Sequence, residues 1–186
     1  MPRLTCANTA PPGREMSVHI ADLSPGDTGT IQQVFAGLST QSSYQRYQSA
    51  RSTLPIHTQR RLADVRPGRH VAHVATLGGR PVGIVRWIRS TRLEPAGDCS
   101  AELAIEVIDA QQRRGIGRLL MACAVRSAIA AGVDCLHAYI AGSNRSLVRR
   151  LVEYGGVPDR ADPDLFRLST AELYREISPA GPVGGR

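Results

Sequence analysis

A short glycine-containing turn between an apolar strand and an amphipathic helix constrains this chain more than any other feature. The strand is predicted at Ser100–Ile108 (SAELAIEVI), the turn is Gln112–Gly117 (QRRGIG), and a helix with apolar residues at helical spacing begins at Gly115. Glycine lets a ligand approach the backbone closely, and the first N–H groups of a helix have no partner within it. The turn therefore predicts an anion site suited to a pyrophosphate. A tight turn without a ligand is the alternative.

Two common phosphate-binding turns do not fit these residues. A dinucleotide-binding turn needs a third glycine where this chain has Leu120, and it needs an acidic residue at ribose distance on a second strand, which is missing. A P-loop needs a lysine, and all 23 residues counted as lysine or arginine are arginines. The turn must therefore belong to another class.

The rest of the chain alternates strand and helix patterns, which predicts an α/β fold with one domain. We expect a flexible segment at 1–16, a single domain at 17–174 and a disordered tail at 175–186. Gly78-Gly79 predicts a hairpin turn, and Arg89–Asp98 predicts a loop. The remaining expected elements are strands at Ser17–Leu23, His70–Leu77, Pro81–Ile88, Val133–Ile140 and around Leu165–Leu168, and helices following Ser24, Ser39, Leu54, Gly115 and Asn144.

Composition limits the partners and the compartment. The net charge of +7 permits nucleic-acid binding, but the arginines are spread along the chain and only eight aromatic residues are available for stacking, so we rank that function last. No apolar run approaches the roughly 20 residues that span a bilayer, and no secretory leader is visible. The four cysteines lack zinc spacing. We therefore expect a cytoplasmic protein with reduced thiols, no metal and no membrane.

The spacing of Gln112, Gly115 and Gly117 resembles the Gln-x-x-Gly-x-Gly signature of the GNAT superfamily of N-acetyltransferases. The strand before it, the helix after it and Asn144 at the start of the next helix resemble that family as well. The resemblance implies a mixed sheet that splays open between its fourth and fifth strands. It also implies acetyl-CoA as cosubstrate and a bacterial acetyltransferase.

The resemblance places acetyl-CoA along the end of the strand and on the turn. It implies that strand backbone faces the pantetheine arm, that Asn144 hydrogen-bonds this arm and that the turn holds the pyrophosphate. For Asn144 a plain helix cap is the alternative, and for each arginine it is a solvated basic face. The implied cofactor-binding residues are Ile105, Val107, Ile108, Gln112, Arg113, Arg114, Gly115, Ile116, Gly117, Arg118 and Asn144.

Two carboxylates on the strand are candidates for the catalytic base. The two-residue period of a strand puts Glu102, Ala104 and Glu106 on one face. Buried carboxylates are costly without a task or a partner, so an arginine-paired structural role is the alternative. The segments Leu38–Tyr47 and Ala101–Ala104 resemble bacterial Pat-type protein-lysine acetyltransferases. In that group the glutamate at the Glu102 position is the proposed general base, whereas Glu106 replaces an apolar residue and is the second candidate.

Departures from the family leave alternatives open. Leu151 stands where many members carry a general-acid tyrosine, and Gly155-Gly156 replaces the usual Gly-Phe, so no general acid is assigned. The leading hypothesis is an acetyl-CoA-dependent N-acetyltransferase in which a primary amine attacks directly. The acceptor is either a protein lysine, for instance on an acyl-CoA synthetase, or a small amine. The alternative is an acyl-CoA-binding module without turnover. The oligomeric state, a homodimer included, is left open.

Overall fold

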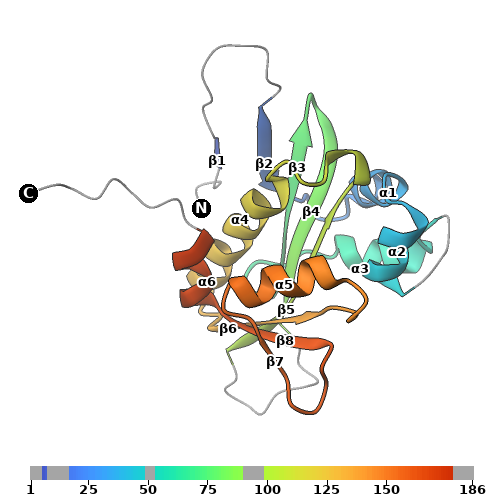
Figure 1. The fold of residues 1–186 in the computed structure, drawn as a ribbon. Helices are drawn as coiled ribbons and strands as arrows, with labels where there is room; N and C mark the ends of the chain where they lie inside the picture. The colour runs from blue at the N-terminus through green and yellow to red at the C-terminus, as the bar shows by residue number, and fades with distance from the viewer. Residues whose placement is uncertain (1–5, 8–16, 49–52, 90–98, 178–186) are drawn as a thin grey trace, which may run out of the picture.

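The computed structural model describes residues 6–7, 17–48, 53–89 and 99–177, which form one eight-stranded mixed sheet flanked by helices (Figure 1). The spatial order of the strands is β1-β2-β3-β4-β5-β6-β8-β7. Their bounds are Cys6–Ala7 for β1, Val18–Asp22 for β2, His70–Leu77 for β3, Arg80–Ile88 for β4, Ser100–Val107 for β5, Cys135–Tyr139 for β6, Val157–Pro158 for β7 and Leu165–Ser169 for β8.

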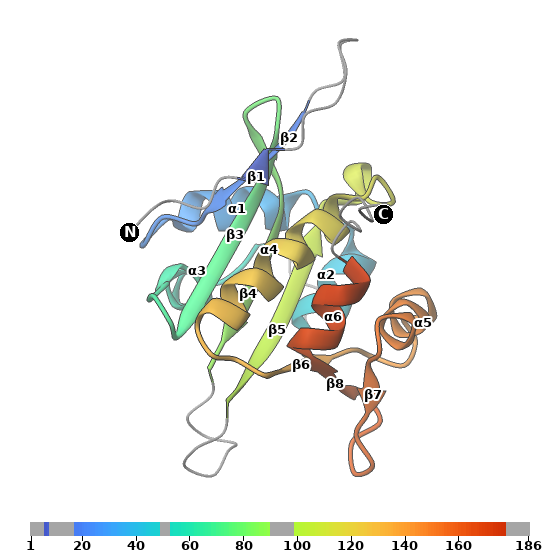
Figure 2. The same cartoon turned by 90° about the vertical axis from the view of Figure 1, so that its left-hand side faces the viewer.

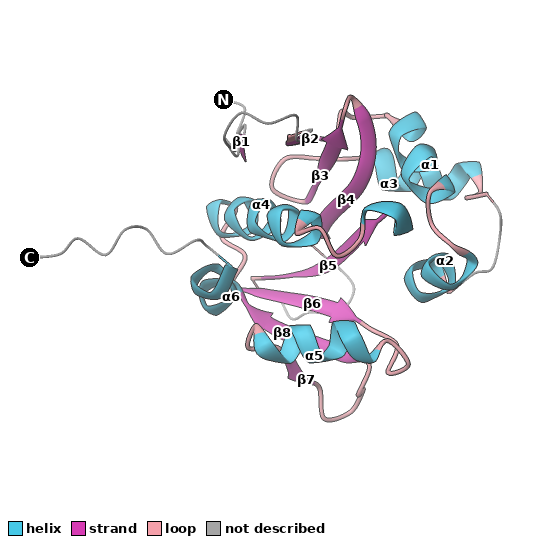
Figure 3. Ribbon diagram, turned by 45° about the horizontal axis from the view of Figure 1, so that its top comes forward, coloured by secondary structure: helices cyan, strands magenta, loops and turns pink. Residues whose placement is uncertain are grey.

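The helices lie on both faces of this sheet (Figures 2 and 3). Helix α1 packs on β4 and on α3, and α4 crosses the other face over β3, β4 and β5 with α6 beside it. No described helix is long and apolar enough to cross a bilayer. The bounds are Thr28–Ala36 for α1, Thr40–Tyr47 for α2, Ile56–Ala63 for α3, Ile116–Ala130 for α4, Arg145–Glu153 for α5 and Thr170–Ile177 for α6, with a 3₁₀ turn at Asp109–Gln111.

Each face of the sheet has its own apolar core. The larger core, between the sheet and α4, α5 and α6, contains the fully buried Trp87 together with Leu120 and Leu136. The smaller core, under α1 and α3, contains Ile31 and Ile84. Alternation along β4 sends Ile84 to one core and Trp87 to the other, as a strand covered on both faces requires. This packing holds the central strands, which carry the candidate site.

The sheet opens between β5 and β6. These two strands are parallel, and they pair only at Ser100–Glu102 with Cys135–His137. After Glu102, β5 continues to pair with β4, whereas β6 pairs with β8. The predicted mixed sheet that splays between its central strands is thereby confirmed.

The local predictions largely match the structure, and the hairpin turn has positive φ angles of 56° at Gly78 and 76° at Gly79.

The helix α6 was not predicted. It runs beyond the predicted domain end at Tyr174 because Leu173 and Ile177, four residues apart, are buried against α4. In the predicted N-terminal segment, β1 pairs with β2. The predicted loop at Arg89–Asp98 lies outside the described residues from position 90 on, as does the predicted tail from 178.

Candidate active site

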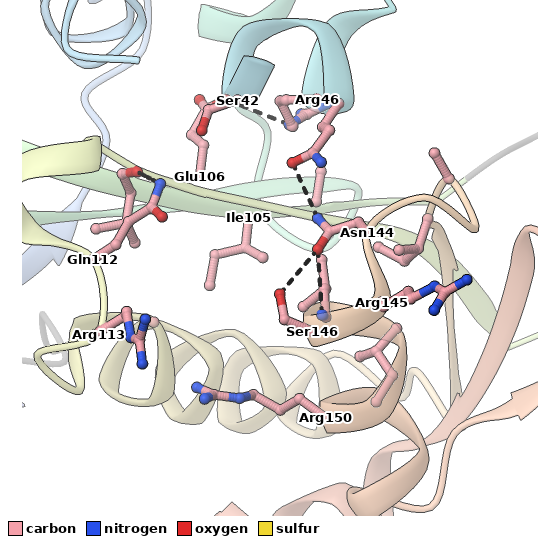
Figure 4. A pocket seen from close by; sticks show the side chains of 18 of the residues that line it. Ser42, Arg46, Ile105, Glu106, Gln112, Arg113, Asn144, Arg145, Ser146 and Arg150 are labelled. Carbon is pink, nitrogen blue, oxygen red and sulfur yellow. Dashed lines mark hydrogen bonds and ion pairs between the residues drawn. The ribbon is translucent and has the colours of Figure 1, made fainter. Parts of the chain in front are cut away.

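The splay between β5 and β6 forms the wall of a large cleft of about 1080 Å³. Residues Ala104–Val107 of β5 line one side, and Tyr139 with the two residues after it lines the other. The turn before α4, helix α2 and helix α5 complete the walls (Figure 4). We refer to this space as the large cleft.

The glycine-containing turn presents a helix N-terminus to the large cleft. Arg113 has a φ of 61° and Gly115 a φ of 80°, so the backbone reverses sharply before α4 begins at Ile116. Among the described residues, no side chain caps this helix, and a Cβ added at Gly115 would meet no atom within 4 Å. Because Gly115 and Gly117 line the cleft, uncapped N–H groups face an open space, as the predicted anion site requires.

Most of the residues implied as cofactor-binding surround the large cleft. Ile116 is buried in the core and anchors the start of α4. Ile108 donates its N–H to the carbonyl of Val82 at 2.9 Å and does not line the cleft, and neither does the exposed Arg114. The residues that do line it are Ile105, Val107, Gln112, Arg113, Gly115, Gly117, Arg118 and Asn144.

Asn144 begins α5 and also connects it to α2. Its Oδ1 accepts a hydrogen bond from the backbone N–H of Leu147 at 3.3 Å, so the predicted helix cap is confirmed. Its Nδ2 donates to Oε1 of Gln45 at 3.2 Å (Figure 4). The side chain thus joins two walls of the cleft, and contact with pantetheine stays a prediction.

Three arginines of α5 line the large cleft and were not predicted as site residues: Arg145, Arg149 and Arg150. Arg150 extends from α5 toward the turn that carries Arg113 (Figure 4). Guanidinium groups suit phosphates because they are permanently charged and offer several donors. The available signal was the amphipathic pattern RSLVRRLVE at 145–153, but the sequence alone does not tell which face of α5 meets the cleft.

Glu106 is a buried carboxylate held by cationic and phenolic partners. Its side chain is 2% exposed, and its two oxygens lie 3.4 Å from Arg46 Nε and 3.4 Å from Arg86 Nη2. The hydroxyl of Tyr47 donates to Oε2 at 2.5 Å. Burial, followed by the charge of Glu106, raises the pKa of Tyr47 well above its usual range, so the phenol stays protonated. Glu106 is therefore paired with arginines, as the structural alternative predicts.

Glu102 lies in a second cavity, which we call the arginine pocket. It has a volume of about 460 Å³ and shares Arg46 and Ala104 with the large cleft. Glu102 is exposed and stands at the last β5–β6 pair, opposite His137. The side-chain face predicted for Glu102, Ala104 and Glu106 agrees with this placement, since Leu103, Ile105 and Val107 of the opposite face pack in or against the larger core.

A hydrogen-bonded corner at Asp109 holds α2 against the end of β5. The carboxylate accepts from the backbone N–H of Ser39 at 2.8 Å and from the hydroxyls of Ser39 at 2.9 Å and Ser42 at 3.0 Å. Partial burial alone would raise the pKa of Asp109, but these hydrogen bonds outweigh it and lower the pKa below its ordinary value of 3.8.

The Asp109 corner is expected to make stability depend on acid. A lowered folded-state pKa means that its contribution is complete above the unfolded value and is lost as the pH falls through the folded value. Asp109→Ala should therefore be less stable than the unmodified protein at about pH 7, and the difference should shrink toward about pH 3. Urea unfolding of both proteins over this range measures the effect. A difference independent of pH would contradict it.

Comparison with known proteins places this geometry in a family. Residues 37–153 match the acetyltransferase (GNAT) family. The GNAT domain of S. lividans PAT has a similar fold, with a TM-score of 0.73 and 22% identity over 82% of this chain and 89% of that one. The yncA protein from Salmonella typhimurium, solved with its cofactor acetyl-CoA, has a TM-score of 0.64 and 14% identity over 90% of this chain and 99% of that one.

A third structure is longer than this chain. The cAMP-binding acyltransferase from Mycobacterium smegmatis has a TM-score of 0.57 and 21% identity, and the match covers 95% of this chain but only 57% of that one. At these identities the structures demonstrate a shared fold. The family match extends over more than half of the chain and includes Glu102, the turn and Asn144. The chain therefore belongs to the GNAT family of acetyltransferases.

Proposed function

We propose that this protein transfers the acetyl group of acetyl-CoA to a primary amine by direct attack of the amine. The observation that carries the proposal is the meeting of two features in one cleft. β5 separates from β6 directly after Glu102, and the uncapped N-terminus of α4 lines the same space. The open strand offers backbone groups to an extended arm, and the helix N-terminus offers N–H groups to phosphates.

The residues of the large cleft fit acetyl-CoA, which supplies an acetyl group activated as a thioester. Gly115 and Gly117 leave space above the turn for phosphate oxygens. Arg113, Arg118 and Arg150 supply positive charge around that space. On β5, Ala104–Val107 presents backbone without a strand partner on the β6 side, where amide groups can pair.

Glu102 is the proposed general base. An amine that is protonated at neutral pH must lose a proton before it can attack a carbonyl carbon. Glu102 reaches solvent and lies where the arginine pocket meets the last β5–β6 pair, so its carboxylate can take that proton directly or through water. The nitrogen then bonds to the acetyl carbon, and the carbon–sulfur bond breaks with its electron pair on sulfur. The nitrogen loses its second proton, which protonates the leaving CoA thiolate through water.

Acetyl-CoA binding is tested by a pair of matched glycine variants. Gly115 and Gly26 have φ angles of 80° and 81°, and a Cβ at either would meet no atom within 4 Å, but only Gly115 lines the large cleft. Both Gly115→Ala and Gly26→Ala should lose about 1–2 kcal/mol of stability from the left-handed backbone. Only Gly115→Ala should weaken acetyl-CoA binding, because its new methyl group occupies the anion site.

Calorimetric titration with acetyl-CoA measures this binding, and release of CoA in the presence of amines measures transfer. Equal affinities for the two glycine variants would remove the turn from the binding site. Tight acetyl-CoA binding without CoA release from any primary amine would favour the acyl-CoA-binding module over the enzyme.

A further inference from the structure

Arginines are concentrated in the arginine pocket relative to the rest of the chain. Six of its fourteen lining residues are arginines, whereas the whole chain has 23 in 186 residues. Only two carboxylates, Asp64 and Glu102, line it with them. The six come from α2, α3, β4, the residue that follows β4 and the segment before β3, and are Arg46, Arg61, Arg66, Arg69, Arg86 and Arg89.

Four of these arginines are already engaged by groups of the protein. Arg46 and Arg86 pair with Glu106. Arg66 pairs with Asp64 through two hydrogen bonds of 3.1 and 2.8 Å. Arg89 donates to the carbonyls of Gly68 and Ala131.

Arg61 and Arg69 differ from the other four. Within the part of the chain that the structure describes, neither side chain has a hydrogen bond or an ion pair, and both are exposed. Arg61 lies on α3, and Arg69 directly precedes β3. The pocket thus holds two cations that no carboxylate of the described chain neutralises, and they are available to a ligand.

Two acceptor groups lie on the sheet floor of the same pocket. His70, Ile88 and Glu102 stand in one row across β3, β4 and β5, and all three line the pocket. Nδ1 of His70 lies 2.9 Å from the carbonyl of Asp64, which requires the proton on Nδ1, and the buried Nε2 has no hydrogen-bond partner among the described residues. Burial, and then the charge of Arg86, lowers the pKa of His70, so Nε2 is a hydrogen-bond acceptor.

We propose that the acceptor is an amine that also carries an anionic group, a carboxylate or a phosphate, which binds Arg61 and Arg69 while the amine lies at Glu102. This inference rests on the proposed acetyltransferase function. An amine with only positive charge would meet uncompensated arginines of like sign, whereas an anionic group would pair with them. The exposed carboxylate of Glu102 on the floor suits the N–H groups of the same molecule.

The test compares acceptors that differ only in charge. One set is γ-aminobutyrate, butylamine and putrescine, and the other is three peptides whose central lysine is flanked by aspartates, serines or arginines. The kcat/KM of the anionic member of a set should exceed that of the neutral member by about tenfold, because two solvent-exposed ion pairs together contribute about that factor. The cationic member should have the lowest kcat/KM of its set. The set that shows turnover distinguishes a free amine from a lysine in an acidic segment.

A double variant ties the preference to the pocket. Arg61→Gln combined with Arg69→Gln removes two charges without breaking any described side-chain contact, and should lower kcat/KM for the anionic acceptor to that of the neutral one. Arg175→Gln on α6, which is exposed and away from both cavities, is the matched control and should keep the preference.

Four results overturn the inference, and only the last also overturns the proposed function. Equal kcat/KM for all charges removes the anionic acceptor, and a preference that survives the double variant removes Arg61 and Arg69 as its binding site; both leave the acetyltransferase intact. Preference for putrescine does the same. No CoA release with any amine overturns both the inference and the proposed function.

Discussion

Replacing Glu106 with alanine is expected to lower the free energy of unfolding by about 3–5 kcal/mol, because it leaves a buried arginine without its counter-charge. Arg86 is 2% exposed and cannot turn to water, whereas Arg46 is 22% exposed and can. Burial lowers the pKa of the Arg86 guanidinium and the charge of Glu106 opposes that effect, so removing Glu106 leaves the cost of burial uncompensated. Chemical denaturation of the variant measures the loss.

Two further variants separate the charge from the space that it occupies. Glu106→Leu combined with Arg86→Met replaces the pair with apolar side chains of similar size, and should restore most of the stability. Glu176→Ala, at an exposed position on α6, should change stability by less than about 0.5 kcal/mol. A loss below about 1 kcal/mol in Glu106→Ala would show that water reaches the pair in solution.

Glu102→Gln is expected to reduce the rate of acetyl transfer by about 10²–10⁴-fold, the usual contribution of a positioned base. The carboxamide keeps the shape of the side chain but cannot take the proton of the amine. Because Glu102 is exposed and has no described ion-pair partner, the variant should fold and bind acetyl-CoA as before. The defect should become smaller at high pH, where more of the amine is already deprotonated.

The measurement is steady-state CoA release at saturating acetyl-CoA across pH, with Glu176→Gln as the control carboxylate. A rate within about twofold of the unmodified protein would exclude Glu102 as the base. Loss of acetyl-CoA affinity along with rate would instead assign it to binding.

Local patterns predicted the parts of the fold that depend on neighbouring residues. The strand, turn and helix from Ser100 to Ala130 follow from alternation, glycine positions and helical spacing, and the hairpin follows from Gly78-Gly79. These signals also located one wall of the large cleft, since the strand and turn proposed to bind acetyl-CoA form one continuous segment. The sequence pattern also indicated that Glu102 and Glu106 share a face.

The parts that depend on distant residues could not be predicted in the same way. The two-residue repeat of the strand predicts the face on which Glu106 lies. It does not predict the pairing of Glu106 with Arg46 and Arg86, which are 60 and 20 residues away in the sequence. The side chains of the arginine pocket come from several separate segments, so no run of basic residues in the sequence indicates the pocket. The alternation of the strand treats the two carboxylates alike, and only the family resemblance ranks Glu102 first. Tertiary packing separates them, because Glu106 pairs with arginines of the protein whereas Glu102 lines the arginine pocket.

The early end of the β5–β6 ladder gives this sheet an edge in its interior. Most proteins keep exposed strand edges short, because an unpaired row of N–H and C=O groups can pair with a strand of another molecule and cause aggregation. Here such a row runs from Leu103 to Val107, with helices α2, α4 and α5 around it. The helices flank this row of backbone groups, and the large cleft leaves it open to a ligand that can pair with strand amides. The fold thus keeps an unpaired strand edge inside the molecule, where α2, α4 and α5 surround it, rather than at the outer edge of the sheet.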